Sequence, residues 1–246
     1  MRLAVIADIH GNLPALEAVL ADIAARGAHR TVNLGDCVSG PLWPRETMDL
    51  LETLRLPTVR GNHDRWIAET PRERMYPSDS FAADRLTAAQ RATLGALPAQ
   101  LELDGGITAV HGTAADDNQY LLEHVANGLL VLSPAAEVAS RLGPSSARVL
   151  LCGHSHQPRV VRGPDDLLIV NPGAVGCPAY DDPTPPSPHV SETGAPHARY
   201  AIIAHERGTW SVDLLAVTYD WNAASARAAA NGRPEWARAL ATGYVR

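Results

Sequence analysis

The sequence predicts an α/β protein, and three features of the 246-residue chain carry this prediction. In the first 60 residues, short runs of β-forming residues alternate with stretches whose apolar residues recur at helical spacing, the pattern of parallel βα units. From residue 101 onward, paired strand patterns are joined by Gly-containing turns, which is typical of hairpins. Hydrophobic residues make up 46% of the chain, enough for a large core built mostly from Val, Leu, Ile and Ala.

The expected elements follow in chain order. We expect a strand at 4–7, a helix that opens at Leu13-Pro14 and stops at Gly27, a strand at 31–34, a helix at 45–55 and a strand at 57–60. Later elements are hairpins at 101–110, 159–170 and 200–219, a helix at 133–141, a strand at 148–152, and helices at 221–230 and 234–242. No boundary is visible, so residues 1–246 are expected to form one domain.

Two segments interrupt this order. Residues 65–100 are charged and Pro-interrupted before a helix capped by Thr87, and they could form one wall of a crevice or a plain connecting helix pair. Residues 177–198 contain six prolines and little apolar surface, which predicts an exposed, mobile loop. We expect substrate selection to depend on the first segment, through Arg65, Trp66, Arg72 and Arg74.

Composition excludes several classes of protein. The net charge is −6 and all 21 basic side chains are arginines, so lysine-dependent chemistry, such as a P-loop or a Schiff base, is absent. The acidic chain also makes a nucleic-acid partner unexpected. Met1-Arg2 leads directly into the first strand and no apolar run reaches membrane length, so we expect a cytoplasmic protein without membrane contact. Cys37, Cys152 and Cys177 are expected as buried thiols.

Five of the expected strands end in side chains that can bind a metal. Ligands at the carboxyl ends of buried strands converge on one crevice. Asp, Asn and His without Cys are the donors that first-row divalent cations use in oxygen and nitrogen sites. Any one of these motifs would be weak, but five in order are not a chance occurrence. The predicted metal ligands are Asp8, His10, Asp36, Asn62, His111, His154 and His156.

These residues divide into two sets around Asp36. A carboxylate can bridge two cations, with Asp8, His10 and His156 around one, and with Asn62, His111 and His154 around the other. We expect two divalent transition-metal ions, drawn from Mn²⁺, Fe²⁺, Zn²⁺ and Ni²⁺.

His63 follows the ligand Asn62 and is expected to act as a general acid, with Asp64 fixing its tautomer. Glycines beside the ligands are expected where the backbone needs unusual angles. The remaining histidines are expected to be solvated; they are His29, His124, His189, His197 and His205.

With these motifs the chain resembles the calcineurin-like metallophosphoesterase superfamily. That family's pattern reads Asp-x-His, Gly-Asp, Gly-Asn-His-(Asp or Glu), His and Gly-His-x-His, and every element is present here. The match extends to residue 176, and the compact size and Asp-Ile-His-Gly-Asn start are similar to the small bacterial phosphodiesterase branch. The resemblance implies a four-layer αββα sandwich of two mixed β-sheets flanked by helices. It also implies a dinuclear centre bridged by Asp36, with His63 as the acid.

Two differences from the motifs of known subfamilies argue against placing the chain in them. The Asp-Arg-Gly that follows the bridging Asp in protein phosphatases and symmetrical dinucleoside tetraphosphatases is replaced here by Cys37-Val38-Ser39-Gly40. The metal-binding Tyr of purple acid phosphatases is absent from that stretch.

The expected function is metal-dependent hydrolysis of phosphoric esters. A metal-bound hydroxide would attack phosphorus and His63 would protonate the leaving oxygen. The expected partner is a small phosphoester, with nucleotide-derived esters among the candidates. A phosphodiesterase and a phosphatase remain equal alternatives. The sequence does not determine the physiological metal or the oligomeric state. Two rivals are a non-enzymatic scaffold on this fold and a nuclease of the same superfamily; His63 argues against the first and the acidic chain against the second.

Overall fold

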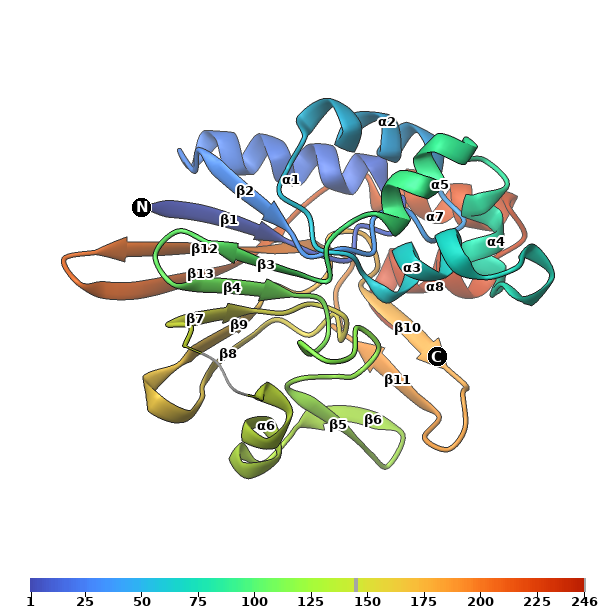
Figure 1. The fold of residues 1–246 in the computed structure, drawn as a ribbon. Helices are drawn as coiled ribbons and strands as arrows, with labels where there is room; N and C mark the ends of the chain where they lie inside the picture. Colours follow the sequence, from blue (N-terminus) through green and yellow to red (C-terminus); the bar gives the residue numbers. More distant parts are fainter. Residues whose placement is uncertain (144–145, 246) are drawn as a thin grey trace.

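The computed structural model describes residues 1–143 and 146–245, and its two central sheets stack between layers of helices (Figure 1). One sheet has the strand order β13-β12-β1-β2, formed by β1 (Arg2–Ile6), β2 (Arg30–Asn33), β12 (Ala198–Glu206) and β13 (Thr209–Val217). The other has the order β3-β4-β7-β9-β8, formed by β3 (Gln100–Leu103), β4 (Ile107–Val110), β7 (Val149–Leu151), β8 (Arg159–Arg162) and β9 (Leu168–Asn171). Both mix parallel and antiparallel pairs, which confirms the predicted αββα class.

The helices form the outer layers and one flank. The first sheet is covered by α1 (Leu13–Ala25), α2 (Pro44–Leu54), α7 (Trp221–Ala230) and α8 (Pro234–Thr242), and the second by α6 (Ala135–Leu142). The flank is built from α3 (Asn62–Glu69), α4 (Pro77–Ala83) and α5 (Ala88–Gly95). Short 3-10 turns lie at Arg72–Arg74 and Pro164–Asp166. None of the helices in 1–143 and 146–245 is long and apolar enough to cross a bilayer.

The period-two alternation of strand residues explains why the sheets stack. In β1, Val5 is fully buried between the two sheets, whereas its neighbour Ile6 is fully buried against the helices. In β7, Leu151 faces the first sheet and Leu150 packs toward α6. Because successive side chains point to opposite faces, an uninterrupted apolar run makes a strand that is covered on both sides.

A third sheet was not predicted. It has the order β10-β11-β6-β5, formed by β5 (Glu123–Ala126), β6 (Leu129–Leu132), β10 (Ala179–Asp182) and β11 (His189–Glu192). The prediction of an exposed loop at 177–198 is therefore wrong for most of the segment: β10 and β11 pair antiparallel, and residues 183–188 form the exposed tip between them. The expected strand at 57–60 is reduced to a single bridge between Asn33 and Thr58.

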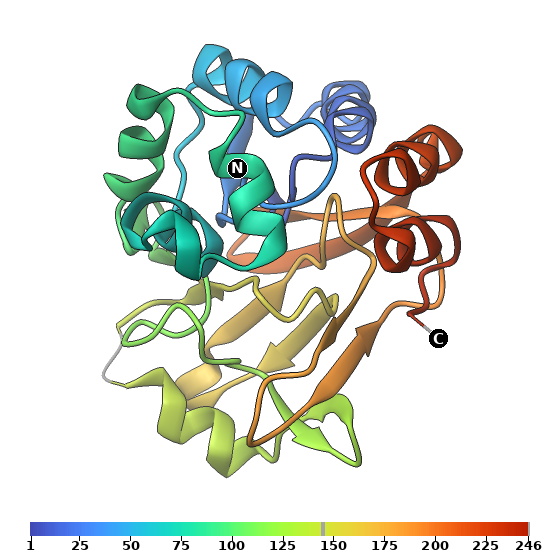
Figure 2. The same cartoon turned by 90° about the vertical axis from the view of Figure 1, so that its right-hand side faces the viewer.

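The carboxyl ends of β1, β4 and β7 open on one edge of the molecule. Figure 2 looks onto this edge and shows that α3–α5, α7–α8 and the third sheet surround it. The segment 65–100 therefore does lie beside the strand ends. An apolar cluster that includes Val38, Ile67 and Leu94 fixes it there.

Candidate metal centre

All seven predicted ligands come together at this edge. Two groups form, and within each group the ligand atoms lie within 4.8 Å of one another. The first group is Asp8, His10 and His156, and the second is Asp36, His111 and His154. Asn62, the first residue of α3, joins the second group because its Oδ1 lies 2.9 Å from His111 Nε2.

Asp36 lies between the two groups. Its Oδ2 is 3.8 Å from His10 Nε2 in the first group and 3.4 Å from His111 Nε2 in the second. Its Oδ1 accepts a hydrogen bond from the backbone N–H of His63 at 3.0 Å. One oxygen is thereby held by the protein while the other faces both sets of imidazoles.

Backbone carbonyls orient three of the four imidazoles. Nδ1 lies 2.7 Å from the Ser39 carbonyl in His10, 2.7 Å from the Leu34 carbonyl in His111 and 2.8 Å from the Cys177 carbonyl in His156. Because a carbonyl only accepts, each Nδ1 carries a proton, and Nε2 is the nitrogen that faces the centre and can bind a cation. This arrangement is typical of histidines that bind metals.

The donor set fits divalent cations. The Nε2 atoms of His10 and His156 are only 3.2 Å apart, so two neutral rings would bring two lone pairs together. Asp8 Oδ1, 3.5 Å from His156 Nε2, is buried and has no hydrogen-bond partner among the described residues. Buried polar atoms without partners are costly. A cation bound to the two Nε2 atoms and to Asp8 Oδ1 would end the repulsion between the lone pairs and give the oxygen a partner.

The backbone at the ligands is strained. A positive φ costs an ordinary residue roughly 1–2 kcal/mol, and such strain concentrates at functional sites. Five of the seven ligands adopt it, with φ between 51° and 68°: Asp8, His10, Asp36, His154 and His156.

One of the expected glycine positions has a clear steric reason. A Cβ at Gly61 would lie 2.2 Å from Asp36 Oδ1 and 2.5 Å from the Asp36 backbone nitrogen. Only glycine lets the start of α3 approach Asp36 this closely.

Burial and neighbouring charges shift the ligand pKa values in opposite directions. Burial, followed by the neighbouring imidazole charges, lowers the pKa of His10 to about 4 and that of His154 to about 3. Burial also lowers the pKa of His111, but the Asp36 carboxylate outweighs it and raises this pKa to about 9. The Asp8 carboxylate likewise outweighs burial and raises the pKa of His156. Without cations, His111 and His156 therefore hold a proton at neutral pH, while His10 and His154 are already neutral.

His63 is beside the centre and contacts a carboxylate other than the one predicted. Its Nδ1 lies 2.7 Å from Asp79 Oδ1 in α4, and its ring is 5.5 Å from that of His10. The expectation that Asp64 orients His63 is wrong. The Asp64 carboxylate accepts instead from the backbone N–H groups of Asp36, Cys37 and Gly61 at 2.9–3.0 Å. At the third position of α3 it caps its own helix and holds the Asp36 loop.

The third sheet and the loop before β5 bring two tyrosines and a histidine to the opposite side: Tyr180 and His189 lie on β10 and β11, and Tyr120 lies in the loop. The Tyr120 ring stacks on His154, with ring centroids 4.7 Å apart, and the Tyr180 ring meets His156 edge-on at 4.7 Å. The Tyr120 hydroxyl is 2.8 Å from both the Tyr180 hydroxyl and His189 Nε2. His189 is buried, so the expectation that it is solvated is wrong. No spacing in the sequence signals these contacts.

The arginines of segment 65–100 do not behave as expected. Arg65 makes two hydrogen bonds with Asp117, at 2.8 and 2.6 Å, and Arg72 is paired in the same way with Asp84. Trp66 does reach the centre, since its ring meets His63 edge-on at 4.8 Å.

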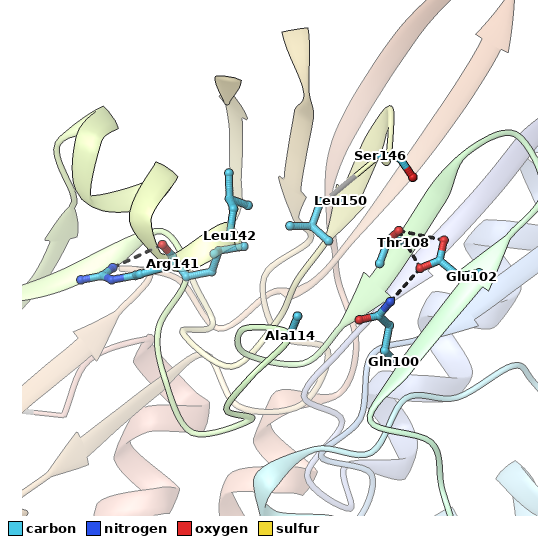
Figure 3. A pocket seen from close by; sticks show the side chains of 9 residues that line it. Gln100, Glu102, Thr108, Ala114, Arg141, Leu142, Ser146 and Leu150 are labelled. Atoms are coloured by element: carbon cyan, nitrogen blue, oxygen red, sulfur yellow. Dashed lines mark hydrogen bonds between the residues drawn. The ribbon is translucent and has the colours of Figure 1, made fainter. Parts of the chain in front are cut away.

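A separate hollow of about 210 Å³ lies between β3, β4, β7 and α6 (Figure 3). Two of its polar side chains, Thr108 and Gln100, donate to a third, Glu102. None of the predicted ligands lines it, so it is distinct from the metal centre.

Comparisons with known proteins agree with this geometry. The sequence profile of the calcineurin-like phosphoesterase superfamily domain matches residues 1–190. A crystal structure of a metallophosphoesterase from Sphaerobacter thermophilus has a TM-score of 0.74 and 28% identity, covering 99% of this chain and 100% of that chain. The hypothetical protein PH1004 from Pyrococcus horikoshii has a TM-score of 0.77 and 21% identity, covering 99% and 98%.

One curated relative, the uncharacterized protein MJ0912 from Methanocaldococcus jannaschii, is 26% identical over 256 aligned positions, covering 95% of this chain and 94% of that protein. The chain belongs to the calcineurin-like phosphoesterase superfamily. It is a metallophosphoesterase, a hydrolase of phosphoester bonds.

Proposed function

We propose that this protein hydrolyses small phosphoesters at a dinuclear metal centre bridged by Asp36, with His63 as the general acid. The position of Asp36 supports the proposal most strongly, because one buried carboxylate oxygen faces His10 in one ligand group and His111 in the other. Asp8, His10, Asp36 and His156 would hold one cation, and Asp36, Asn62, His111 and His154 the other. Two divalent cations against two carboxylates would supply surplus positive charge for a phosphoryl group and acidify water.

The residues around the centre have separate tasks in this proposal. Asp64 fixes the Asp36 loop through backbone hydrogen bonds, so the bridging carboxylate keeps one orientation. His63 donates a proton from Nε2 to the departing oxygen of the ester, while its Nδ1 remains bound to Asp79. The charges of Asp79 and Asp36 outweigh the effect of burial and raise the pKa of His63 to about 9, which keeps the ring protonated at neutral pH.

The flanks are proposed to face the ester substituents. Trp66 and Tyr76 lie on the His63 side, with ring centroids 5.6 Å apart, and Tyr120 and Tyr180 lie on the other. Aromatic side chains on both sides fit a nucleotide-derived ester, whose base or sugar can pack against them. The substrate is a small phosphoester in this proposal, and the chain acts in the cytoplasm.

A substrate panel on reconstituted protein tests the proposal. Protein stripped with a chelator is loaded anaerobically with Mn²⁺, Fe²⁺, Zn²⁺ or Ni²⁺ and given nitrophenyl monoesters, nitrophenyl diesters, cyclic nucleotides and dinucleotides. We expect metal-dependent release of product from at least one class, and the relative rates separate a phosphatase from a phosphodiesterase. Loaded protein that turns over none of the panel faster than the metal ions alone would contradict the proposal and favour a scaffold.

A further inference from the structure

Asp79 is a fully buried carboxylate that none of the sequence motifs includes. It lies in the first turn of α4, within the segment 65–100. Its Oδ1 is 2.7 Å from His63 Nδ1 and accepts a hydrogen bond from Ser39 Oγ, also at 2.7 Å. The three side chains come from separate elements: the loop after β2, the start of α3 and α4.

The proton inventory fixes the tautomer of His63. An ionised carboxylate only accepts hydrogen bonds, so the bond between Asp79 and His63 requires a proton on Nδ1 of His63. The Ser39 hydroxyl has one proton and gives it to Asp79, so it does not compete for that position. Nε2 then remains as the nitrogen that exchanges a proton with a bound ester, and the His63 side chain is 24% exposed.

Stability does not explain why a carboxylate occupies this position. Asp79 Oδ2 is buried and meets no hydrogen-bond donor among the described residues. Burying a carboxylate with one oxygen unsatisfied costs free energy, whereas an uncharged side chain of the same shape would cost less. A charge retained at such a cost indicates a role outside packing.

Ser39 and Arg233 fix the position of Asp79 and connect it to the metal ligands and to the C-terminal helices. Ser39 donates to Asp79 through its hydroxyl, and its carbonyl accepts from Nδ1 of His10 at 2.7 Å. Arg233, at the start of α8, donates to Ser78 Oγ at 3.2 Å and so ties α4 to the C-terminal helices. The acid and one ligand imidazole therefore share a single anchoring residue, Ser39.

We propose that Asp79 is the positioning residue of His63: it fixes the Nδ1–H tautomer and aims Nε2 at the leaving oxygen. The inference rests on the proposed role of His63 as general acid. It assigns α4 to the catalytic machinery, whereas the sequence predicts for its segment either a wall of the crevice or a plain connecting helix pair.

Double-mutant kinetics on the reconstituted holoenzyme test this inference. Asp79→Asn keeps the shape and removes the charge. Asp84→Asn is the matched control, because it makes the same substitution at the residue that directly follows α4, where the side chain is half-exposed. We expect Asp79→Asn to lower kcat about 10- to 100-fold for alkyl esters and only slightly for nitrophenyl esters, which need little protonation. Metal content should stay at the wild-type value, and Asp84→Asn should match wild type.

The double variant separates positioning from structure. If Asp79 acts through His63, adding Asp79→Asn to His63→Ala causes no further loss of kcat. Additive losses, or equal losses for good and poor leaving groups, would overturn the inference while leaving the proposed function intact. If His63→Ala lowers kcat equally for alkyl and nitrophenyl esters, the proposed role of His63 itself is overturned instead.

A spectroscopic readout needs neither turnover nor a variant. Long-range ¹H–¹⁵N spectra of the wild-type protein, recorded at a pH where the His63 ring is neutral, should show its one ring proton on Nδ1. A His63 ring with Nδ1 unprotonated would overturn the inference, whether or not any substrate is hydrolysed.

Discussion

The ligand loops and the two flanks of the centre are held in place by different interactions. The loops are buried, and backbone hydrogen bonds tie them together, as in the bonds from Asp8 to Gly35 and from His10 to Asp36. The flanks are half-exposed and depend on side-chain pairs, such as Arg65 with Asp117 and Tyr120 with Tyr180. Backbone bonds fix geometry regardless of side-chain identity, so the loops suit shared metal chemistry and the flanks suit substrate choice.

His63 belongs to neither region and should show the largest effect after the ligands. His63→Ala removes the proposed acid but none of the proposed ligands, so kcat for alkyl esters should fall about 10²- to 10⁴-fold while the metal content stays constant. The loss should shrink for nitrophenyl esters. His29→Ala, an exposed histidine, is the control. Metal loss in His63→Ala would assign the residue to the ligand loops instead.

Substitution of Asn171 tests whether the ligand loops depend on hydrogen bonds from side chains that do not bind the metal. Its Nδ2 donates to the Gly153 carbonyl at 2.8 Å and to Ser155 Oγ at 3.0 Å, which holds the loop of His154 and His156. Asn171→Ala should weaken metal binding about 10- to 100-fold, measured by competition with a chromophoric chelator. Asn118→Ala, at an exposed position, should not. Unchanged affinity in both variants would show that the loop needs no such support.

The shifted pKa of His111 predicts how metal binding depends on pH. Its pKa is raised to about 9 in the metal-free protein, so between pH 7 and 9 a cation must displace a proton. Between pH 7 and 9, apparent affinity should rise about tenfold per pH unit for each ligand that is still protonated. Calorimetry in buffers of different ionisation enthalpy should detect the released protons. Affinity that is constant from pH 6 to 9 would show that His111 is already neutral.

The flanks should give the smallest effects, and these should depend on substrate. Tyr180→Phe removes one hydroxyl from the pair with Tyr120, so KM should change about 2- to 10-fold for some members of a diester panel with little change in kcat. Trp66→Ala should reorder the same panel from the other side. Shortening the tip at 183–188 should leave the order unchanged. A reordering by the tip alone would place substrate recognition outside both flanks.

The sequence predicts the seven ligands because each one follows the end of an expected strand within a few residues, often beside a glycine, although the expected strand before Asn62 is only a single bridge. It does not predict Asp79, Tyr180 or His189, because these side chains reach the centre through the packing of α4 and the third sheet. Adjacency in sequence predicts that Asp64 orients His63, but helix geometry turns the Asp64 carboxylate back to the start of α3. A neighbour in sequence is seldom the partner of a side chain on a helix.

The fold is likewise divided into parts that local sequence predicts and parts that depend on long-range packing. The buried strands of the two main sheets are predicted because their apolar runs are continuous. The strands of the third sheet have only four residues each, and a proline-containing tip separates β10 from β11. Pairing between distant strands, rather than local pattern, creates this sheet.

Metal stoichiometry tests the bridged dinuclear centre most directly. Elemental analysis of anaerobically reconstituted wild-type protein should find close to two ions per chain. Asp36→Ala, which removes an oxygen shared by both groups, should lose both ions under the same conditions, whereas the exposed control Asp104→Ala should keep two. Saturation of the wild type at one ion, or two ions retained by Asp36→Ala, would contradict the bridging role of Asp36.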